Sequence, residues 1–551
     1  MTTDTQDIAP VTKGASPTKP TRPERIDIGD GLIMRWSTKA DASNIADCMA
    51  ECFKWIPLGA PVAEDEEPTR NEWVHAGCLR LLRGNHTVMT ENDFAIVENT
   101  LAKEGENPII ACTCLMTGTG YYGDIDLSLG KPEAVGCLPE YRNKGLIRRL
   151  FLEMIHPASE ARGDIIQFLP GIPHFYLQFG YEYALGVRPV RAIHDVSKKI
   201  PTLATGETEP FTLREPTLAD LPYLVEMSSP KRMLNQAQIG AYYDEPYWRY
   251  TIHTVLETAE SHYDINRISR IIVDPKTGKD AGLVMLCGHS IKYLGIFTLD
   301  KGYSYREALY PVLRQLLAAA SEPTPFDKRE AAKKAAAEAK ESPVVEQDNK
   351  DKKDETPAAA AAHPHNFSSI GIALDTQHPV YKLLEPKSEP FGPKHRLYTR
   401  IPSYATFIQR VAPTLERRIA ESPLAGITAS FRFNFFRKVE GAAGKQLEIV
   451  IADGKIVSAS DDYLEPSPRA LMEAARERIA AAKAAGVADK KPLVFKAEFA
   501  PLTFTRLVVG DLSLDEMLDF YSQASVEGDE AKMLLKIMFP KNVFHLDIFW
   551  W

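Results

Sequence analysis

Apolar residues recur at helical spacing in the stretch that follows Gly145, at positions Leu146, Ile147, Leu150, Phe151, Met154 and Ile155. This spacing predicts an amphipathic helix with one buried face. A short run that ends at Val135-Gly136-Cys137 precedes the helix and predicts a strand. The chain therefore contains a predicted strand–turn–helix unit in its first third.

Weaker patterns of apolar residues on either side predict further helices and strands, beginning near Ile26. Together with the strand–turn–helix unit they indicate an α+β domain. Helices are predicted over 38–54 and 70–82, with strands at 33–36, 93–97, 109–116 and 164–169 and from 181. One or two helical turns are expected over 174–179.

A second unit is expected from about Phe211. Its Thr217-Leu218-Ala219-Asp220 segment repeats the Thr38-Lys39-Ala40-Asp41 segment that opens the first predicted helix. Strands are predicted at 268–273, 281–288 and 292–299, and a helix over 305–320. The repeated opening suggests a diverged copy of the first unit.

The composition changes over 321–367, where Lys, Glu and Ala dominate. Such a segment buries too little apolar area to offset its ordering entropy, so we expect it to be largely disordered, with a solvated helix in part. An apolar strand pattern resumes at 369–374. The segment is therefore interpreted as an insertion within the second unit.

A third unit is expected from Leu397. Helices are predicted over 403–420, 467–485, 513–523 and 528–539, and strands at 427–435, 446–452 and 495–499. The tail from Val543 to Trp551 is too apolar to be exposed to water and is expected to be buried. The expected organisation is thus a disordered tail (1–24), a first domain (25–200), a second domain (201–396) and a third domain (397–551).

Length, charge and cysteine content exclude several classes of protein. The 551 residues are too many for one hydrophobic core, and the formal net charge of −9, with no clustered basic face, argues against nucleic-acid binding. There is no apolar run long enough for a membrane span, and the polar start is unlike a signal peptide. Seven cysteines without a CxxC pair predict no metal site and suit a reducing, cytoplasmic setting.

The turn between the predicted strand and helix carries the chemistry. A helix begins with backbone N–H groups that have no intrahelical partner, and its dipole adds positive potential there. Arg142 can add charge-assisted hydrogen bonds, and Gly145 lets the backbone approach a ligand closely. The pattern Arg142-x-x-Gly145 therefore predicts either a diphosphate site or a plain strand–turn–helix.

This stretch resembles the CoA-binding motif of the GNAT acetyltransferases, Arg/Gln-x-x-Gly-x-Gly/Ala. Ile147 stands where that motif has Gly or Ala. The Eis-type branch of the family reads Arg-x-x-Gly-Leu-Leu-Arg, and the chain is similar to it over Arg142 to Arg148.

Two further features resemble the Eis-type enzymes. The segment from Phe175 to Tyr181 is similar to the family's Ile-Tyr-Gly-Arg-Phe-Gly-Tyr, with Gln178 in place of Arg. The starts and ends of the third unit, such as Arg400-Ile401-Pro402 and Met538-Phe539-Pro540, resemble the family's C-terminal domain. The resemblance implies two GNAT-like domains, the second degenerate, followed by a sterol-carrier-like α+β domain.

The resemblance also implies acetyl-CoA as co-substrate, an amine acceptor that is either a small molecule or a peptide, and a homo-oligomer. Tyr176 would be the general acid and the terminal carboxylate of Trp551 the general base. Backbone groups of the strand end would align the pantetheine, and the turn would hold the diphosphate; these cofactor-binding residues are Val135, Gly136, Cys137, Arg142, Asn143, Lys144, Gly145, Leu146, Ile147 and Arg148. The second unit lacks Arg-x-x-Gly and is expected to bind no CoA.

Each assignment has a plainer alternative. Tyr176 could be one packing aromatic among several, and Trp551 could simply anchor the tail; His174 and Glu140 are spare candidates for the base. The acidic loop 64–67 could attract a cationic amine or be merely solvated. The competing functions are a non-catalytic lipid- or acyl-CoA-binding protein and a protein lysine acetyltransferase.

Overall fold

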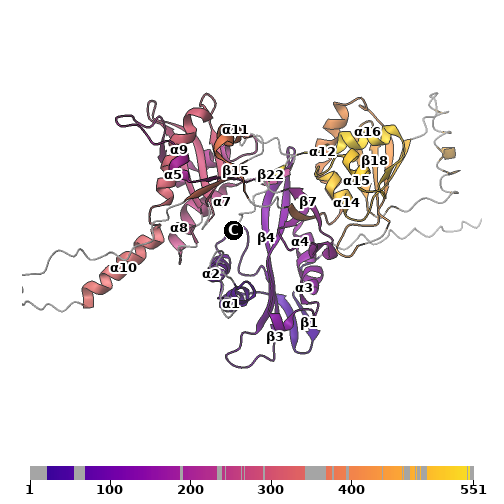
Figure 1. The fold of residues 1–551 in the computed structure, drawn as a ribbon. Helices are drawn as coiled ribbons and strands as arrows, with labels where there is room; N and C mark the ends of the chain where they lie inside the picture. The colour runs from indigo at the N-terminus through magenta and orange to yellow at the C-terminus, as the bar shows by residue number, and fades with distance from the viewer. Residues whose placement is uncertain are drawn as a thin grey trace, which may run out of the picture.

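Three β-sheets organise the chain, and Figure 1 shows the unit built on the first sheet lying between the other two units. The computed structural model describes residues 21–54, 69–186, 190–232, 239–241, 243–261, 264–265, 267–288, 292–341, 368–374, 378–391, 396–436, 439–461, 493–542 and 544–545, with single positions between 463 and 484. The mixture of helices and mostly antiparallel strands confirms the predicted α+β class.

The first sheet runs in a nearly sequential strand order through the first unit. Its path is β1 (Arg25–Gly29), β2 (Leu32–Trp36), β3 (Phe94–Asn99), β4 (Ile109–Tyr122), β5 (Ile125–Cys137), β6 (Ile166–Leu169), β16 (Arg396–Arg400) and β7 (Glu182–Gly186). All neighbours on this path are antiparallel except β5 and β6, which are parallel. Strands predicted at 33–36, 93–97, 109–116 and 164–169 are confirmed.

Helices cover both faces of this sheet. On one face α1 (Ala42–Cys52) and α2 (Glu72–Leu81) bury an apolar cluster that includes Ile45, Met49 and Cys112. On the other face α3 (Leu146–Arg149) continues through a π-helical segment (Leu150–Ile155) into α4 (His156–Arg162) and buries Leu146, Leu150 and Met154. The amphipathic helix predicted after Gly145 is thus confirmed, with its apolar face on the sheet.

Three strands of the first sheet come from distant parts of the sequence. The strand β16 begins where the third unit was expected to begin, yet it lies between β6 and β7. The short β10 (Ile239–Ala241) pairs antiparallel with the end of β4, and β22 (Phe544–His545) pairs parallel with β10. The sheet therefore joins the first unit to the other two.

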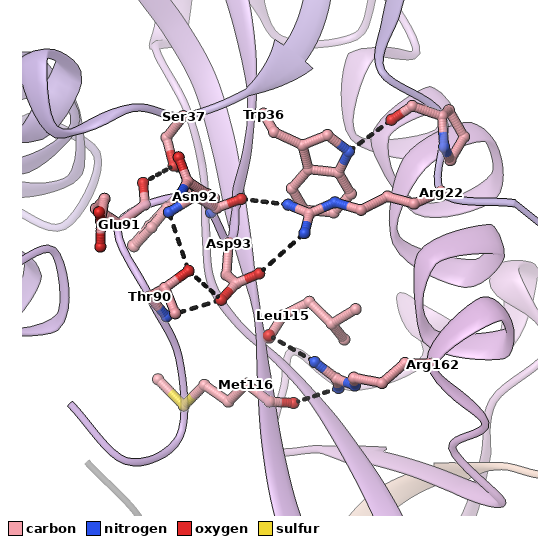
Figure 2. Close-up of polar contacts among 12 residues, drawn as sticks. Arg22, Trp36, Ser37, Thr90, Glu91, Asn92, Asp93, Leu115, Met116 and Arg162 are labelled. Carbon is pink, nitrogen blue, oxygen red and sulfur yellow. Dashed lines mark hydrogen bonds and ion pairs between the residues drawn. The ribbon is translucent and has the colours of Figure 1, made fainter. Parts of the chain in front are cut away.

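A network of arginines holds the N-terminal segment against the first sheet (Figure 2). The Arg22 guanidinium lies 3.9 Å from the centroid of the Trp36 ring and 3.4 Å from the Asp93 carboxylate. From the C-terminal end of α4, Arg162 donates hydrogen bonds to the carbonyl oxygens of Leu115 and Met116, at 3.4 and 2.9 Å. These contacts fix β4 in the region where it passes β5.

The second sheet repeats the opening of the first unit. Its order is β15 (Glu389–Pro390), β8 (Arg191–His194), β14 (Ser369–Ile372), β13 (Lys292–Leu299), β12 (Lys279–Cys287), β11 (Arg267–Asp274) and β9 (Thr212–Arg214). Arg214 donates to both carboxylate oxygens of Asp220, at 2.9 and 2.8 Å. Arg35 does the same with Asp41, at 2.8 and 2.8 Å. The matching ion pairs and Thr caps support the duplication that the sequence suggested.

The third unit is a five-stranded sheet covered by helices on one face. Its order is β19 (Lys455–Ser460), β18 (Gln446–Ala452), β17 (Ala429–Asn434), β20 (Leu493–Glu498) and β21 (Ser525–Val526). The covering helices are α12 (Tyr404–Ala420), α14 (Thr503–Val508), α15 (Leu514–Phe520) and α16 (Asp529–Met538). The α+β content is as predicted, and the likeness to sterol-carrier domains stays a prediction.

Some expected features lie outside the described residues: the acidic loop 64–67, most of the alanine-rich helix 467–485, residues 342–367 of the insertion, and 1–20 of the tail. Within the insertion the structure has a helix, α10 (Pro325–Glu341). Among the described helices, none is long and apolar enough to cross a membrane.

Candidate functional site

The strands β5 and β6 separate at the centre of the first sheet. Their parallel pairing is limited to Leu129 with Ile166 and Gly130 with Gln167. Beyond Gly130 the strand β5 continues to Cys137, paired only with β4 among the described residues. One edge of β5 from 132 to 137, which includes the predicted Val135, Gly136 and Cys137, therefore presents backbone groups that an extended ligand could pair with, although the Cys137 carbonyl oxygen also accepts from Arg142.

A β-bulge lies in the same part of β5. The register with β4 shifts between the pairs Cys112–Gly136 and Cys114–Glu133, and Ala134 has a left-handed φ of 52°. A bulge inserts an extra residue and re-aims the side chains beyond it. Here it leaves Gly136 facing α1, where an added Cβ would lie 2.7 Å from Met49 Sδ. Val135 instead packs toward the aromatic cluster around Tyr176.

The turn after β5 offers backbone amides to a ligand. Gly145 and Asn143 both have left-handed φ values, 74° and 61°, so the turn reverses sharply before α3 begins. The amides of Asn143, Lys144 and Gly145 donate no hydrogen bond within the described part of the chain. A Cβ added at Gly145 would meet open space. These observations fit an anionic group bound at the start of the helix.

Positively charged side chains surround this turn. Arg142 is exposed, and its Nε donates to the carbonyl of Cys137 at 3.1 Å. Lys144 Nζ lies 4.8 Å from the centroid of the Tyr141 ring. Arg148, one turn further, is paired with Glu440 of the third unit at 2.9 Å. Arg142 and Lys144 are both exposed at the turn, whereas Arg148 has a carboxylate partner.

Two of the predicted residues contribute packing. Leu146 is buried in the cluster between α3 and the sheet. Ile147 is half-buried and contacts both this cluster and the aromatic cluster around Tyr176. Their side chains hold the helix on the sheet, so only their backbone amides could serve the ligand.

Tyr176 lies in a buried aromatic cluster at the start of a 3₁₀ turn (Tyr176–Phe179). Its ring centroid lies 5.2 Å from that of Tyr398 and 5.6 Å from that of Phe151. The residue is 5% exposed, and its hydroxyl forms no hydrogen bond with any described residue. Burial, followed by the charge of Glu133, raises the pKa of Tyr176 above its usual value. The phenol is therefore held in its protonated form.

Glu133 is a residue that sequence reasoning missed. It lies on the separated part of β5, on the face covered by α1 and α2, and forms a 2.9 Å ion pair with the fully buried Lys131. Its charge influences Tyr176. The signal available was the Lys-Pro-Glu sequence between the apolar stretches Leu127–Gly130 and Ala134–Cys137, broken only by Ser128, since buried charges are uncommon unless paired.

Trp551, the predicted base, lies outside the described residues, and the described strand nearest to it in the sequence, β22 (Phe544–His545), ends six positions before it. In β22, His545 is level with Gly240, which is level with Tyr121 of β4. The spare candidates His174 and Glu140 are both exposed, and the His174 ring centroid lies 6.5 Å from that of Tyr183, which packs against the aromatic cluster around Tyr176.

The equivalent place in the second unit is filled by protein side chains. There β13 and β14 are paired in parallel only up to Leu294 and Ile372. Past this point the buried His378 reaches in, and its Nε2 lies 2.8 Å from the Phe297 carbonyl oxygen. The Tyr305 ring packs against His378 at 4.8 Å between centroids. His378 and Tyr305 thus occupy the place beyond the paired residues, and the absence of a CoA site in the second unit stays a prediction.

Comparison with known proteins defines the fold. No family model and no curated protein matches the chain. Among solved structures, a probable N-acyltransferase from Enterococcus faecalis V583 is similar with a TM-score of 0.54 at 13% identity, over 93% of this chain and 98% of that one. GCN5-related N-acetyltransferases from Kribbella flavida and Anabaena variabilis each have a TM-score of 0.52, at 14% and 12% identity. They cover 94% of this chain and 97% and 99% of their own.

The chain therefore has the fold of these GCN5-related N-acetyltransferase structures along nearly its whole length. At such identities the likeness concerns the fold alone. The residues that would perform a reaction must be argued from the site itself.

Proposed function

We propose that the protein is an acetyl-CoA-dependent N-acetyltransferase that transfers the acetyl group to a primary amine. The observation that carries the proposal is the stretch of β5 from 132 to 137, which pairs with no described strand other than β4 and is followed directly by the turn with three available amides. An acyl-CoA has a pantetheine arm that can pair like a strand and a diphosphate that suits a helix start. The fold, which it shares with GCN5-related N-acetyltransferase structures, supports the same reading.

In this proposal the backbone of Val135 and Cys137 pairs with the pantetheine arm, and the amides from Asn143 to Arg148 bind the diphosphate. Arg142 and Lys144 add positive charge at the same turn. Acetyl-CoA supplies an activated thioester, which a neutral amine can attack directly. The site must then place the amine on the face of β5 that α1 and α2 cover.

Tyr176 is proposed as the general acid. A departing thiolate has a conjugate pKa of about 8.5 and an ordinary phenol about 10, so proton transfer to the thiolate is uphill by about 2 kcal/mol in water. Burial raises both pKa values, so the site must destabilise the thiolate at least as much as the phenolate for Tyr176 to donate its proton. The burial that raises the pKa of Tyr176 keeps its proton in place at neutral pH. Its hydroxyl, which has no partner among the described residues, is available to a substrate.

The terminal carboxylate of Trp551 is proposed as the general base. Because β22 is parallel to β10, and β10 is antiparallel to β4, the step from Phe544 to His545 runs toward lower residue numbers of β4. Six residues in extended conformation reach about 20 Å. From the level of Tyr121, that reach extends to about Leu115, next to Cys114, which pairs with Glu133.

A free carboxylate is a weak base toward an alkylammonium. With pKa values of about 3.5 and 10.4, direct proton transfer is uphill by roughly 9 kcal/mol. The site must reduce this difference between the two pKa values by desolvating both groups, or the amine must already be neutral when it binds. Glu133 is a second candidate for the base, but its ion pair with Lys131 already neutralises its charge.

The proposal is tested by incubating the full chain with acetyl-CoA and a panel of diamines, aminoglycosides and lysine peptides, read by free-thiol release and mass spectrometry. Acetylated small amines would support it. Acetylation of lysine peptides alone would favour a protein lysine acetyltransferase. Stoichiometric CoA binding without turnover on any amine would favour an acyl-CoA-binding protein instead.

A further inference from the structure

A loop of the third unit contacts the segment that carries Tyr176. The loop joins β17 to β18, and its residues 439–444 are described. A Cβ added at Gly180, just after the Tyr176–Phe179 turn, would lie 2.4 Å from the carbonyl carbon of Gly441. A Cβ added at Gly441 would lie 2.4 Å from the carbonyl oxygen of Phe179. The two backbones therefore touch directly, which only glycine on both sides allows.

Arg400 fixes this loop to the first unit. It is 4% exposed, and its Nε donates to the carbonyl oxygen of Gly441. Its Nη2 donates to Glu160, on α4, at 2.5 Å. A buried guanidinium bridging a carbonyl and a carboxylate is costly to displace, because moving either partner leaves a buried charge uncompensated. The loop is thus held in one position relative to α4.

The neighbouring Glu440 engages the predicted diphosphate site. Its carboxylate lies 2.9 Å from Nη1 of Arg148, and both side chains are largely exposed. Arg148 also donates to the side chain of Gln178. A guanidinium can serve either Glu440 or a phosphate oxygen well, and the two anions compete for its donors.

We propose that the 439–444 loop of the third unit is a positioning element of the catalytic site. Gly441 holds the 176–179 turn, and through it Tyr176, while Glu440 holds Arg148 until a diphosphate replaces it. Binding of CoA then releases Glu440 and changes the contact between the first and third units. This inference rests on the proposed function and adds to it a control of CoA affinity by the third unit.

The first test measures CoA affinity by isothermal titration, beginning with the unaltered protein. Glu440→Gln removes the competing charge and is expected to tighten CoA binding two- to fivefold. Glu440→Asp should restore the original affinity in part. Glu421→Gln, an exposed glutamate at the end of α12, serves as the control and should change nothing.

The second test separates positioning from stability. Gly441→Ala is expected to lower kcat at least tenfold with little change in the KM for acetyl-CoA, and to have little further effect in a Tyr176→Phe background. Gly454→Ala, at the β18–β19 turn with a similar φ of 74°, controls for destabilising the third unit. If Gly441→Ala does not fold, the Glu440 variants decide alone.

The outcomes distinguish this inference from the proposed function. If the unaltered protein binds no CoA, the proposed function itself fails. If it binds CoA but Glu440→Gln leaves the affinity unchanged or weakens it, or if Gly441→Ala behaves like Gly454→Ala, the positioning role of the loop is overturned.

Discussion

The ring of Tyr176 lies directly against the backbone of Gly171. A Cβ added at Gly171 would lie 2.2 Å from Cε2 and 2.7 Å from Cδ2 of that ring. Real Cβ atoms do not approach other atoms so closely, so one of the two residues would have to move. Since Phe151, Phe179 and Tyr398 pack around the rest of the ring, the absence of a side chain at Gly171 helps to fix the position of the phenol.

Gly171→Ala should therefore displace Tyr176 and lower kcat. A displacement of about 1 Å at a reacting group can cost on the order of 100-fold in rate. Steady-state kinetics should show this loss in kcat while the Kd for CoA stays the same. In a Tyr176→Phe background the alanine should cause little further loss, and full additivity of the two changes would argue against this explanation.

Tyr176→Phe should reduce kcat by roughly 10²- to 10⁴-fold, the usual contribution of a general acid. The fold should be retained, because the hydroxyl forms no hydrogen bond with the described residues. Tyr183→Phe is the matched control, because the Tyr183 ring also belongs to this region and stacks on the ring of Tyr398. This variant should keep most of the activity. An unchanged kcat in Tyr176→Phe would remove this residue from the mechanism.

The alkaline side of the pH–rate profile should reflect the raised pKa of Tyr176. A general acid must be protonated to act, and burial moves the loss of its proton above the ordinary tyrosine value of about 10. The kcat should thus show no decline due to this group below about pH 10. A descending limb near pH 8 that disappears in Tyr176→Phe would contradict the raised pKa.

The two residues with left-handed φ in the turn before α3, Asn143 and Gly145, should respond differently to substitution. Gly145→Ala places a Cβ at a φ of 74°, which should lower the free energy of unfolding by about 1–2 kcal/mol. The same substitution should weaken CoA binding. Asn143→Gly puts glycine at a φ of 61°, which glycine adopts freely, and should leave both properties nearly unchanged. Thermal unfolding and CoA titration of both variants check this, and equal losses in the two would contradict it.

Removal of Trp551 should lower kcat at least 100-fold without affecting CoA affinity, if the terminal carboxylate is the base. The new carboxylate would be about 3.3 Å short of its position, too far for proton transfer. Extension of the chain by one glycine should have a similar effect. Full activity in both variants would shift the role to another group, with Glu133 next in order.

Prediction from the sequence worked best where a clear periodicity of apolar residues ended at a turn-forming residue. The helix after Gly145 and the strand that ends at Cys137 are both present, because their buried faces are continuous apolar stripes. The Thr–Asp opening at Thr217 also proved to be a structural repeat, since both copies carry the same capping and arginine pair.

The parts that sequence reasoning missed depend on contacts between distant segments. The three-residue β10 and two-residue β22 are too short to show a period, and only their pairing with β4 defines them. Glu133 was missed because a carboxylate in a strand usually faces water, whereas here Lys131 pairs with it beneath α1 and α2. The role of Gly171 depends on the packing of Tyr176, which no local pattern encodes.

The pairing of β22 with β10 at the end of β4 has a consequence for biosynthesis. Strand β4 is synthesised long before Phe544–His545, so the first sheet remains without β22 while most of the chain is being made. Most of the first unit can assemble during translation, but this edge is completed late. A fusion partner attached close behind β22 would burden this late step, whereas one attached before β1 would not.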